Sequence, residues 1–164
     1  MNRRKFIYNS SIATLSVMGM QSCNILDRNV KISILHTNDV HSQIEAFPFN
    51  HNIYPDRGGF AKRANIFKGL MKINPNTLIF DAGDIFQGTP YFNFFQGELE
   101  LNLMKKMGYN AATIGNHEFD AGVDILKRNI INNDFQFISS NYDFTNTALE
   151  LSLIHISEPT RLHT

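Results

Sequence analysis

The chain has 164 residues, of which 43% are hydrophobic, and this size and composition fit one globular domain. Fifteen basic residues balance fifteen acidic residues, so no net charge favours a nucleic acid polymer or general attraction to a membrane surface. The single cysteine, Cys23, excludes a disulfide within the chain and a zinc site built from several thiolates. Function must therefore be sought in local groups of residues.

The first 23 residues have the features of an export signal. Basic residues at 3–5 precede a modestly apolar stretch over 6–20, which is shorter than the roughly 20 apolar residues of a transmembrane helix. The Arg-Arg-Lys-Phe-Ile sequence at 3–7 resembles a twin-arginine signal, and Met-Gln-Ser-Cys at 20–23 resembles a bacterial lipobox that would lipidate Cys23. We expect an exported bacterial protein, periplasmic or a cell-surface lipoprotein, whose membrane contact is confined to the signal or lipid anchor. The alternative is an ordinary cleaved signal with an incidental cysteine.

Strands and helices are predicted to alternate after a polar tether at residues 24–29. Apolar runs predict strands over residues 30–35, 77–80, 111–114 and 135–139. Apolar residues at helical spacing predict helices over residues 60–73, 98–107 and 123–131. Gly108 is expected to end the second of these helices. The alternation implies right-handed crossovers, a largely parallel sheet and an α/β fold.

One charged helix face and four histidines are expected to be solvent-exposed or structural. In the helix over 98–107, one face should carry Leu99, Leu103 and Met107. The expected solvent-facing set of this helix is Glu98, Glu100, Lys105 and Lys106. The histidines expected to be structural or exposed are His36, His51, His155 and His163.

The sequence changes character after about Thr147. Residues 148–164 follow neither a helical nor a strand period, and we expect them to be a non-native tail such as translated vector sequence. A short C-terminal strand and loop is the alternative. The ordered domain is therefore expected at residues 30–147.

Three of the predicted strands are followed directly by polar clusters. Asp39 and His41 follow the first strand, Asp84 follows the second, and Gly-Asn-His-Glu-Phe-Asp at 115–120 follows the third. The carboxyl ends of parallel strands meet at one edge, where open α/β sheets bind their ligands. We expect the three clusters to converge there.

The residue types in these clusters predict a two-metal hydrolytic site. Asp39 and His41 are two residues apart, so in an extended segment they would point to the same side and hold one cation. The two oxygens of Asp84 could bridge to a second ion, to which Asn116 offers a neutral oxygen. Two divalent ions suit a phosphate ester, whose oxygens they polarise. Mn²⁺, Zn²⁺, Mg²⁺ and Co²⁺ all remain open as cofactors.

His117 and Asp120 are predicted to form the catalytic pair of this site. A departing alkoxide needs a proton or a stabilising cation, which an imidazolium provides. Asp120, three residues along, would favour the protonated ring. Taken alone, Asp39 with His41 fits a polar loop cap and Asp84 fits a helix N-cap, whereas polar residues directly after a buried strand are costly unless something satisfies them.

The sequence resembles the 5′-nucleotidase family of calcineurin-like metallophosphatases. The matching motifs are Leu-His-Thr-Asn-Asp-Val-His at 35–41, Asp-Ala-Gly-Asp at 81–84, Gln-Gly-Thr-Pro at 87–90 and the segment 108–120. The resemblance runs from about residue 32 to 144 and implies a four-layer α/β/β/α sandwich with two metal ions. It implies that the chain acts on nucleotides or related phosphoesters. It assigns the metal ligands to Asp39, His41, Asp84 and Asn116, and the catalytic pair to His117 and Asp120.

The chain lacks later features of that family. Members have further histidines in Gly-His and Gly-His-x-His segments, and a C-terminal domain that holds the nucleobase, whereas this chain contains no Gly-His pair. The second ion would keep only Asp84 and Asn116, and one apolar face of the sheet would be uncovered. We therefore expect an incomplete, N-terminal part of a metallophosphatase that is inactive alone. The alternatives are a non-catalytic, lipid-tethered binding module, or a related nucleotide-sugar hydrolase, cyclic-nucleotide phosphodiesterase or thiosulfohydrolase.

Overall fold

The computed structural model describes residues 29–150 and the strand residues 154–155, and residues from Ile32 onward form one unit. The predicted export signal, including Cys23, and nearly all of the predicted tether lie outside the described residues. No helix in the described part of the chain combines the length and apolar character that crossing a bilayer requires.

The centre of the fold is a five-stranded parallel sheet in which each strand pairs with the next one along the chain. The strands are β1 (Ser33–Thr37), β2 (Thr77–Asp81), β3 (Ala111–Thr113), β4 (Phe137–Ser139) and β5 (Ile154–His155). Thr37 at the end of β1 lies opposite Asp81 at the end of β2, and Asp81 lies opposite Ala112. The first three strands therefore end at the same edge of the sheet.

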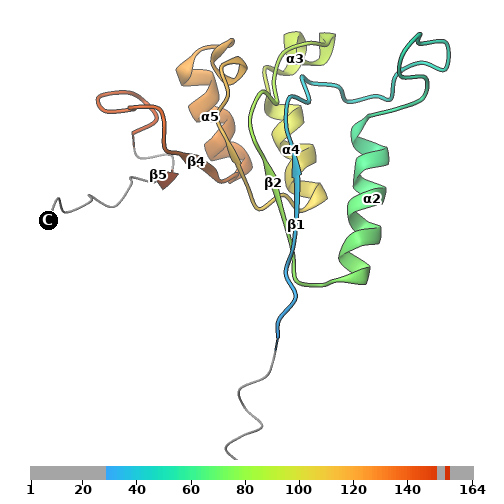
Figure 1. Cartoon of the computed structure of the whole chain (residues 1–164). Helices are drawn as coiled ribbons and strands as arrows, with labels where there is room; N and C mark the ends of the chain where they lie inside the picture. The colour runs from blue at the N-terminus through green and yellow to red at the C-terminus, as the bar shows by residue number, and fades with distance from the viewer. Residues whose placement is uncertain (1–28, 151–153, 156–164) are drawn as a thin grey trace, which may run out of the picture. The chain divides into compact units, whose positions relative to one another are not determined.

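The helices lie together along the sheet (Figure 1). In the described part of the chain they are α2 (Phe60–Ile73), α3 (Pro90–Phe95), α4 (Glu98–Met107) and α5 (Val123–Asn133), together with the 3₁₀ turn η2 (His117–Phe119). Right-handed crossovers that always step to the next strand in one direction place every connecting helix on the same face of the sheet. In agreement, α4 contacts both α2 and α5.

The hydrophobic core fills the space between the sheet and this helix layer. Ile79 of β2, Leu101 and Met104 of α4, and Leu126 of α5 are almost completely buried in it. Ile34 of β1 and its register partner Leu78 of β2 are 66% and 39% exposed. The described strands therefore have the open apolar face that the sequence predicted.

Most predicted elements are present, with shifted ends. β1 runs from Ser33 to Thr37 instead of residues 30–35, because it pairs along the whole of β2. α5 continues to Asn133 instead of 131, and β4 begins at Phe137 instead of 135. Gly108 ends α4 in the left-handed conformation, as predicted. The short helix α3 and the turn η2 were not predicted.

The prediction for the faces of α4 is wrong in one important respect. Glu100 was expected to face solvent, but its exposed fraction is 0%. The fully buried residues of this helix include Leu101 and Met104, whereas Leu99 and Leu103 are only partly buried. Because α4 lies against the sheet and between two helices, its buried arc is wide and includes the position of Glu100.

Two of the four histidines without a predicted catalytic role, His36 and His51, have their side chains in the described part of the chain. His36 is exposed. His51 accepts hydrogen bonds at Nδ1 from the backbone N–H groups of Ile53 and Tyr54, at 3.3 and 3.0 Å, which is a structural role. His163 and the side chain of His155 lie outside the described part.

The segment in which the sequence changes character adds to the sheet where it is described. Leu149 is buried in the core with an exposed fraction of 0%, and β5 pairs in parallel with β4. A short strand at this place is the alternative that the sequence left open for residues 148–164. The remainder of this segment lies outside the described residues.

Candidate metal centre

The loops that follow β1 and β2 are joined by backbone hydrogen bonds. The N–H of Asp39 donates to the carbonyl oxygen of Gly83 at 3.0 Å, and the N–H of His41 donates to that of Asp84 at 3.1 Å. These bonds extend the pairing of the two strands past their ends. They hold Asp39, His41 and Asp84 on neighbouring loops at one edge of the sheet.

Several non-glycine residues of these two loops adopt the left-handed backbone conformation, among them two of the predicted ligands on the first loop and one on the second. The φ angles are 52° for Asp39, 44° for His41, 54° for Ser42 and 54° for Asp84. Non-glycine residues in this region cost about 1–3 kcal/mol when strained and concentrate at functional sites. The prediction of an extended backbone from Asp39 to His41 is therefore wrong. The two side chains meet because the loop turns.

Asp39, His41 and Asp84 form a group that can hold a metal ion. Each offers one ligand atom, and these atoms lie within 4.8 Å of one another. His41 Nε2 and a carboxylate oxygen of Asp39 are 3.9 Å apart, which leaves the space between them for an ion. Carboxylate oxygens together with an imidazole nitrogen suit divalent ions from Mg²⁺ and Mn²⁺ to Zn²⁺. The donor set therefore fits a divalent cation.

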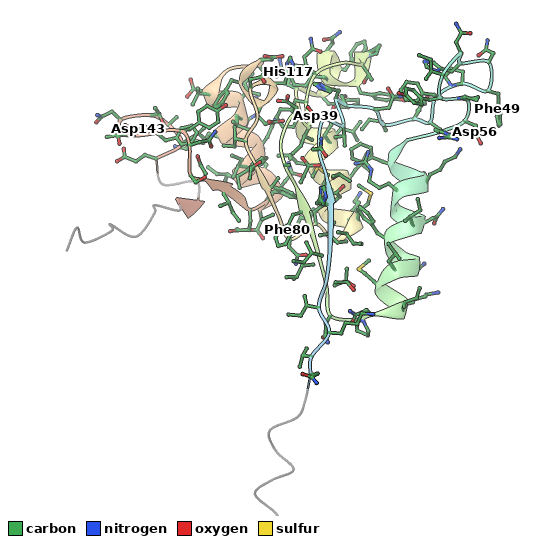
Figure 2. All side chains as sticks on the ribbon, in the orientation of Figure 1. Asp39, Phe49, Asp56, Phe80, His117 and Asp143 are labelled. Atoms are coloured by element: carbon green, nitrogen blue, oxygen red, sulfur yellow. The ribbon has the colours of Figure 1, made fainter. Side chains whose placement is uncertain are left out.

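His117 and Asp120 are hydrogen-bonded to each other beside this group. His117 Nδ1 and Asp120 Oδ2 are 2.8 Å apart, and this hydrogen bond raises the pKa of the His117 imidazole above its ordinary value. The His117 backbone N–H donates to Asp84 Oδ1 at 3.2 Å, and the rings of His41 and His117 are 5.1 Å apart. Asp39 and His117 lie at the same end of the sheet (Figure 2). An imidazole whose protonated form is favoured thus lies next to the metal-binding group.

Asn116 lies one residue before His117, at the start of η2. Asn116 is exposed, and its backbone carbonyl accepts a hydrogen bond from the N–H of Phe119 at 3.3 Å. The structure therefore places Asn116 beside the group, while its role as a ligand stays a prediction.

Glu118 is a residue of this site that the sequence did not reveal. Its side chain is completely buried, and its Oε2 accepts from the backbone N–H groups of Asp84 and Gly115 at 3.0 and 2.6 Å. Its Oε1 accepts from the N–H groups of Ile85 and Phe86 at 2.7 and 3.2 Å. Burial raises the pKa of Glu118 and the four donors oppose that rise. One carboxyl group therefore ties the loop after β3 to the loop after β2. A signal was present in the sequence, because an acidic residue beside His117 had no other assigned role.

Gly115 is needed for this close approach. A Cβ at Gly115 would lie 2.2 Å from Asp84 Oδ1 and 2.5 Å from the Asp84 backbone nitrogen, far inside van der Waals contact. Only glycine therefore lets the loop after β3 reach Asp84.

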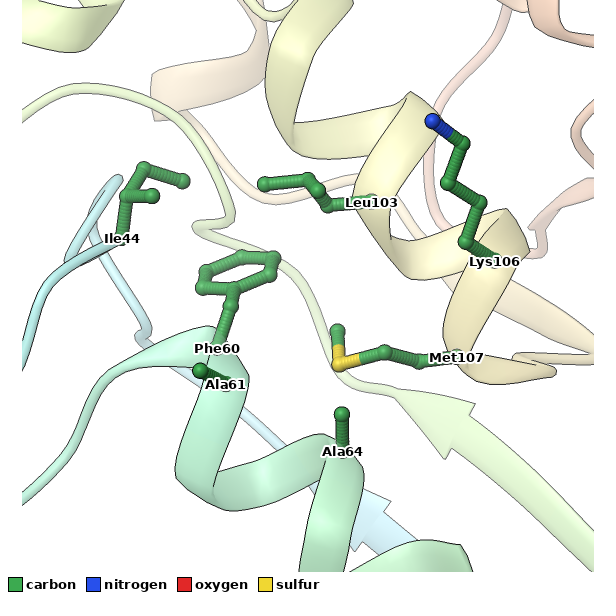
Figure 3. Close-up of a pocket in the computed structure, with 7 residues that line it drawn as sticks. All are labelled: Ile44, Phe60, Ala61, Ala64, Leu103, Lys106 and Met107. Atoms are coloured by element: carbon green, nitrogen blue, oxygen red, sulfur yellow. The ribbon is translucent and has the colours of Figure 1, made fainter.

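An apolar crevice of about 320 Å³ lies between α2 and α4 (Figure 3). Its lining residues are Ile44, Phe60, Ala61, Ala64, Leu103, Lys106 and Met107. None of these is a predicted metal ligand, and the crevice has little polar surface for a phosphate ester. The chemistry of the chain is therefore centred on the loops and not on this crevice.

The structure is a parallel α/β sheet with side chains at its carboxyl edge that can hold a divalent cation. Residues 32–160 match the family model for calcineurin-like phosphoesterases. The chain belongs to this family, and thus to a class of hydrolases.

Similar proteins include 5′-nucleotidases from animals and bacteria. The chain is 36% identical over 115 residues to a snake venom 5′-nucleotidase of Gloydius brevicauda, covering 68% of this chain and 20% of the venom protein. It is 35% identical over 116 residues to a 5′-nucleotidase of Homo sapiens, covering 68% of this chain and 20% of that protein. The chain therefore spans about a fifth of the length of these relatives.

Solved structures confirm the fold. A 5′-nucleotidase precursor from Thermus thermophilus superposes with a TM-score of 0.68 at 33% identity, covering 75% of this chain and 25% of that one. The NAD nucleotidase of Haemophilus influenzae gives a TM-score of 0.65 at 33% identity, covering 75% and 23%. The predicted parallel α/β fold of a metallophosphatase is therefore confirmed for the part that this chain shares.

Proposed function

We propose that the chain is part of an exported, two-metal phosphoesterase that releases phosphate from nucleotides. The observation that carries the proposal is the pairing of His117 with Asp120 directly beside the group formed by Asp39, His41 and Asp84. Its similarity to 5′-nucleotidases favours nucleotides over other phosphoesters. The chain spans only a fifth of those relatives, so this activity is proposed for the longer protein to which the chain corresponds.

The proposed roles follow the chemistry of each side chain. Asp39 and His41 would hold one divalent ion, Asp84 would contact both ions, and Asn116 would hold the second. Bound divalent ions would polarise the phosphate and activate water. His117, whose protonated form is favoured by Asp120, would stabilise or protonate the departing alkoxide. Additional ligands from outside this chain would complete the second position.

Export and lipidation at Cys23 are part of the same proposal. Their support is the Arg-Arg motif and the Met-Gln-Ser-Cys sequence of the first 23 residues. A nucleotide-hydrolysing enzyme outside the cytoplasm would supply phosphate and nucleosides for uptake. The hydrogen-bonded pair of His117 and Asp120 argues against the binding-module alternative, because binding alone does not need such a pair.

The test is metal binding by the full chain, followed by activity of the longer protein. Titration calorimetry with MnCl₂ should give one saturable site in the chain, and Asp84→Asn should weaken it at least about tenfold. Phosphate release from AMP should require the longer reading frame and should fall by about two or more orders of magnitude in His117→Asn. Absence of Mn²⁺ binding at millimolar concentration, or full activity of the His117 variant, would contradict the proposal.

A further inference from the structure

A second buried carboxyl group, Glu100, contacts the metal-binding loop from the helix layer. Glu100 lies on α4, in the first turn of the helix, and its exposed fraction is 0%. Its Oε1 accepts a hydrogen bond from the hydroxyl of Ser42, the residue that follows His41. This contact joins positions 58 residues apart in the chain.

The Ser42 side of this contact is fixed by several other bonds. The Ser42 backbone N–H donates to the carbonyl oxygen of Ile85 at 2.8 Å. The hydroxyl of Thr89 lies 2.7 Å from the Ser42 carbonyl oxygen and 3.0 Å from Ser42 Oγ. The backbone at Gly88 also packs on His41, where an added Cβ would lie 2.6 Å from the His41 carbonyl oxygen. The peptide between His41 and Ser42 is therefore held by neighbours on several sides.

This support matters because the loop is strained. His41 and Ser42 both have positive φ angles, 44° and 54°, which side chains other than glycine adopt only when their surroundings enforce it. Without the bond from Ser42 to Glu100, the loop would lose one of the contacts that enforce this conformation. The direction of the His41 imidazole would then vary.

Stability alone does not explain a carboxyl group at this place. Glu100 has no ion-pair partner among the described residues, its Oε2 has no hydrogen-bond partner there, and burial raises its pKa. A buried polar atom without a partner is costly, so an apolar residue would make a more stable helix interface. A cost of this kind is typical of residues retained for positioning.

We propose that Glu100 is a positioning residue of the metal centre, which orients His41 by holding Ser42 in its left-handed conformation. The inference rests on the proposed function, since it concerns the same metal ion. It adds a contact from α4 to the site, which so far consists of residues on the strand-end loops. Groups that orient a metal ligand typically change metal affinity about 10–100-fold when they are removed.

The choice of variants separates positioning from folding. Glu100→Gln keeps a side-chain oxygen that can accept from Ser42, so it should bind Mn²⁺ within about threefold of the unmodified chain. Glu100→Leu removes that acceptor and should weaken Mn²⁺ binding about 10–100-fold. Glu98→Leu, at an exposed position on the same helix turn, is the matched control and should bind normally.

Mn²⁺ affinity is measured by titration calorimetry of the full chain at a temperature where circular dichroism shows every variant folded. A merely structural role would lower the melting temperature of Glu100→Leu and leave its Mn²⁺ dissociation constant unchanged, which would overturn the inference. If Glu100→Leu does not fold, Ser42→Ala replaces it and should weaken binding by a similar factor. Normal binding by Ser42→Ala would also overturn the inference. Failure of the unmodified chain to bind Mn²⁺ would instead reject the proposed function and the inference with it.

Discussion

Replacing Glu118 by Gln should loosen the contact between the loops after β2 and β3. Each Glu118 oxygen accepts two backbone N–H groups, with N···O distances from 2.6 to 3.2 Å. In Glu118→Gln, one oxygen becomes an NH₂ group that would face two donors, so two hydrogen bonds are lost. Hydrogen bonds to a charged group contribute about 1.5–3 kcal/mol each.

Part of this loss is regained because the amide carries no buried charge, so the expected net destabilisation is about 2–4 kcal/mol. For a domain of this size, that free energy corresponds to a fall in melting temperature of about 6–12 °C. The assay is urea denaturation in EDTA, with Glu98→Gln as the control. Glu98 is exposed in the first turn of α4, where the loss of one charge should cost about 0.5 kcal/mol. A destabilisation of Glu118→Gln equal to that of the control would refute the assignment of Glu118 as the link between the loops.

Three further predictions concern neighbouring groups. Gly115→Ala should destabilise the chain by several kcal/mol and abolish Mn²⁺ binding in calorimetry, because the added Cβ would lie 2.2 Å from Asp84 Oδ1. Near-normal Mn²⁺ binding would contradict the close approach of Gly115 to Asp84. Burial raises the pKa of Asp81 from 3.8 to about 6, so the folded state binds this proton more tightly than the unfolded state. Unfolding free energy in EDTA should therefore fall by about 2 kcal/mol between about pH 4 and pH 6.5 relative to Asp81→Asn, and parallel pH profiles would contradict this. Asp120→Asn should lower the pKa of His117, because it removes the hydrogen-bonded carboxylate. The pKa is measured by NMR titration in EDTA, with Asp124→Asn as the control. An unchanged His117 pKa in Asp120→Asn would show that Asp120 does not act on the ring.

The sequence was sufficient to predict the fold class because the periodicity of apolar residues is a local property. The runs at 77–80 and 111–114 and the amphipathic helix Phe60–Ile73 reflect side-chain spacing alone, and the structure has elements there. The order of these elements also placed the three polar clusters at one edge, because parallel strands share their direction. Asp39, His41 and Asp84 could thus be grouped from the sequence.

The tertiary structure alone decided how those residues meet and what supports them. The left-handed turn at Asp39 and His41 depends on backbone bonds to the loop after β2, and no local pattern encodes that pairing. Glu118 and Glu100 appeared in the sequence as ordinary charged residues, yet both are completely buried. Their burial results from contacts with residues more than 30 positions away, which the pattern of neighbouring residues does not reveal. Local spacing therefore determined the elements and the candidate ligands, whereas long-range hydrogen bonding determined the geometry of the site.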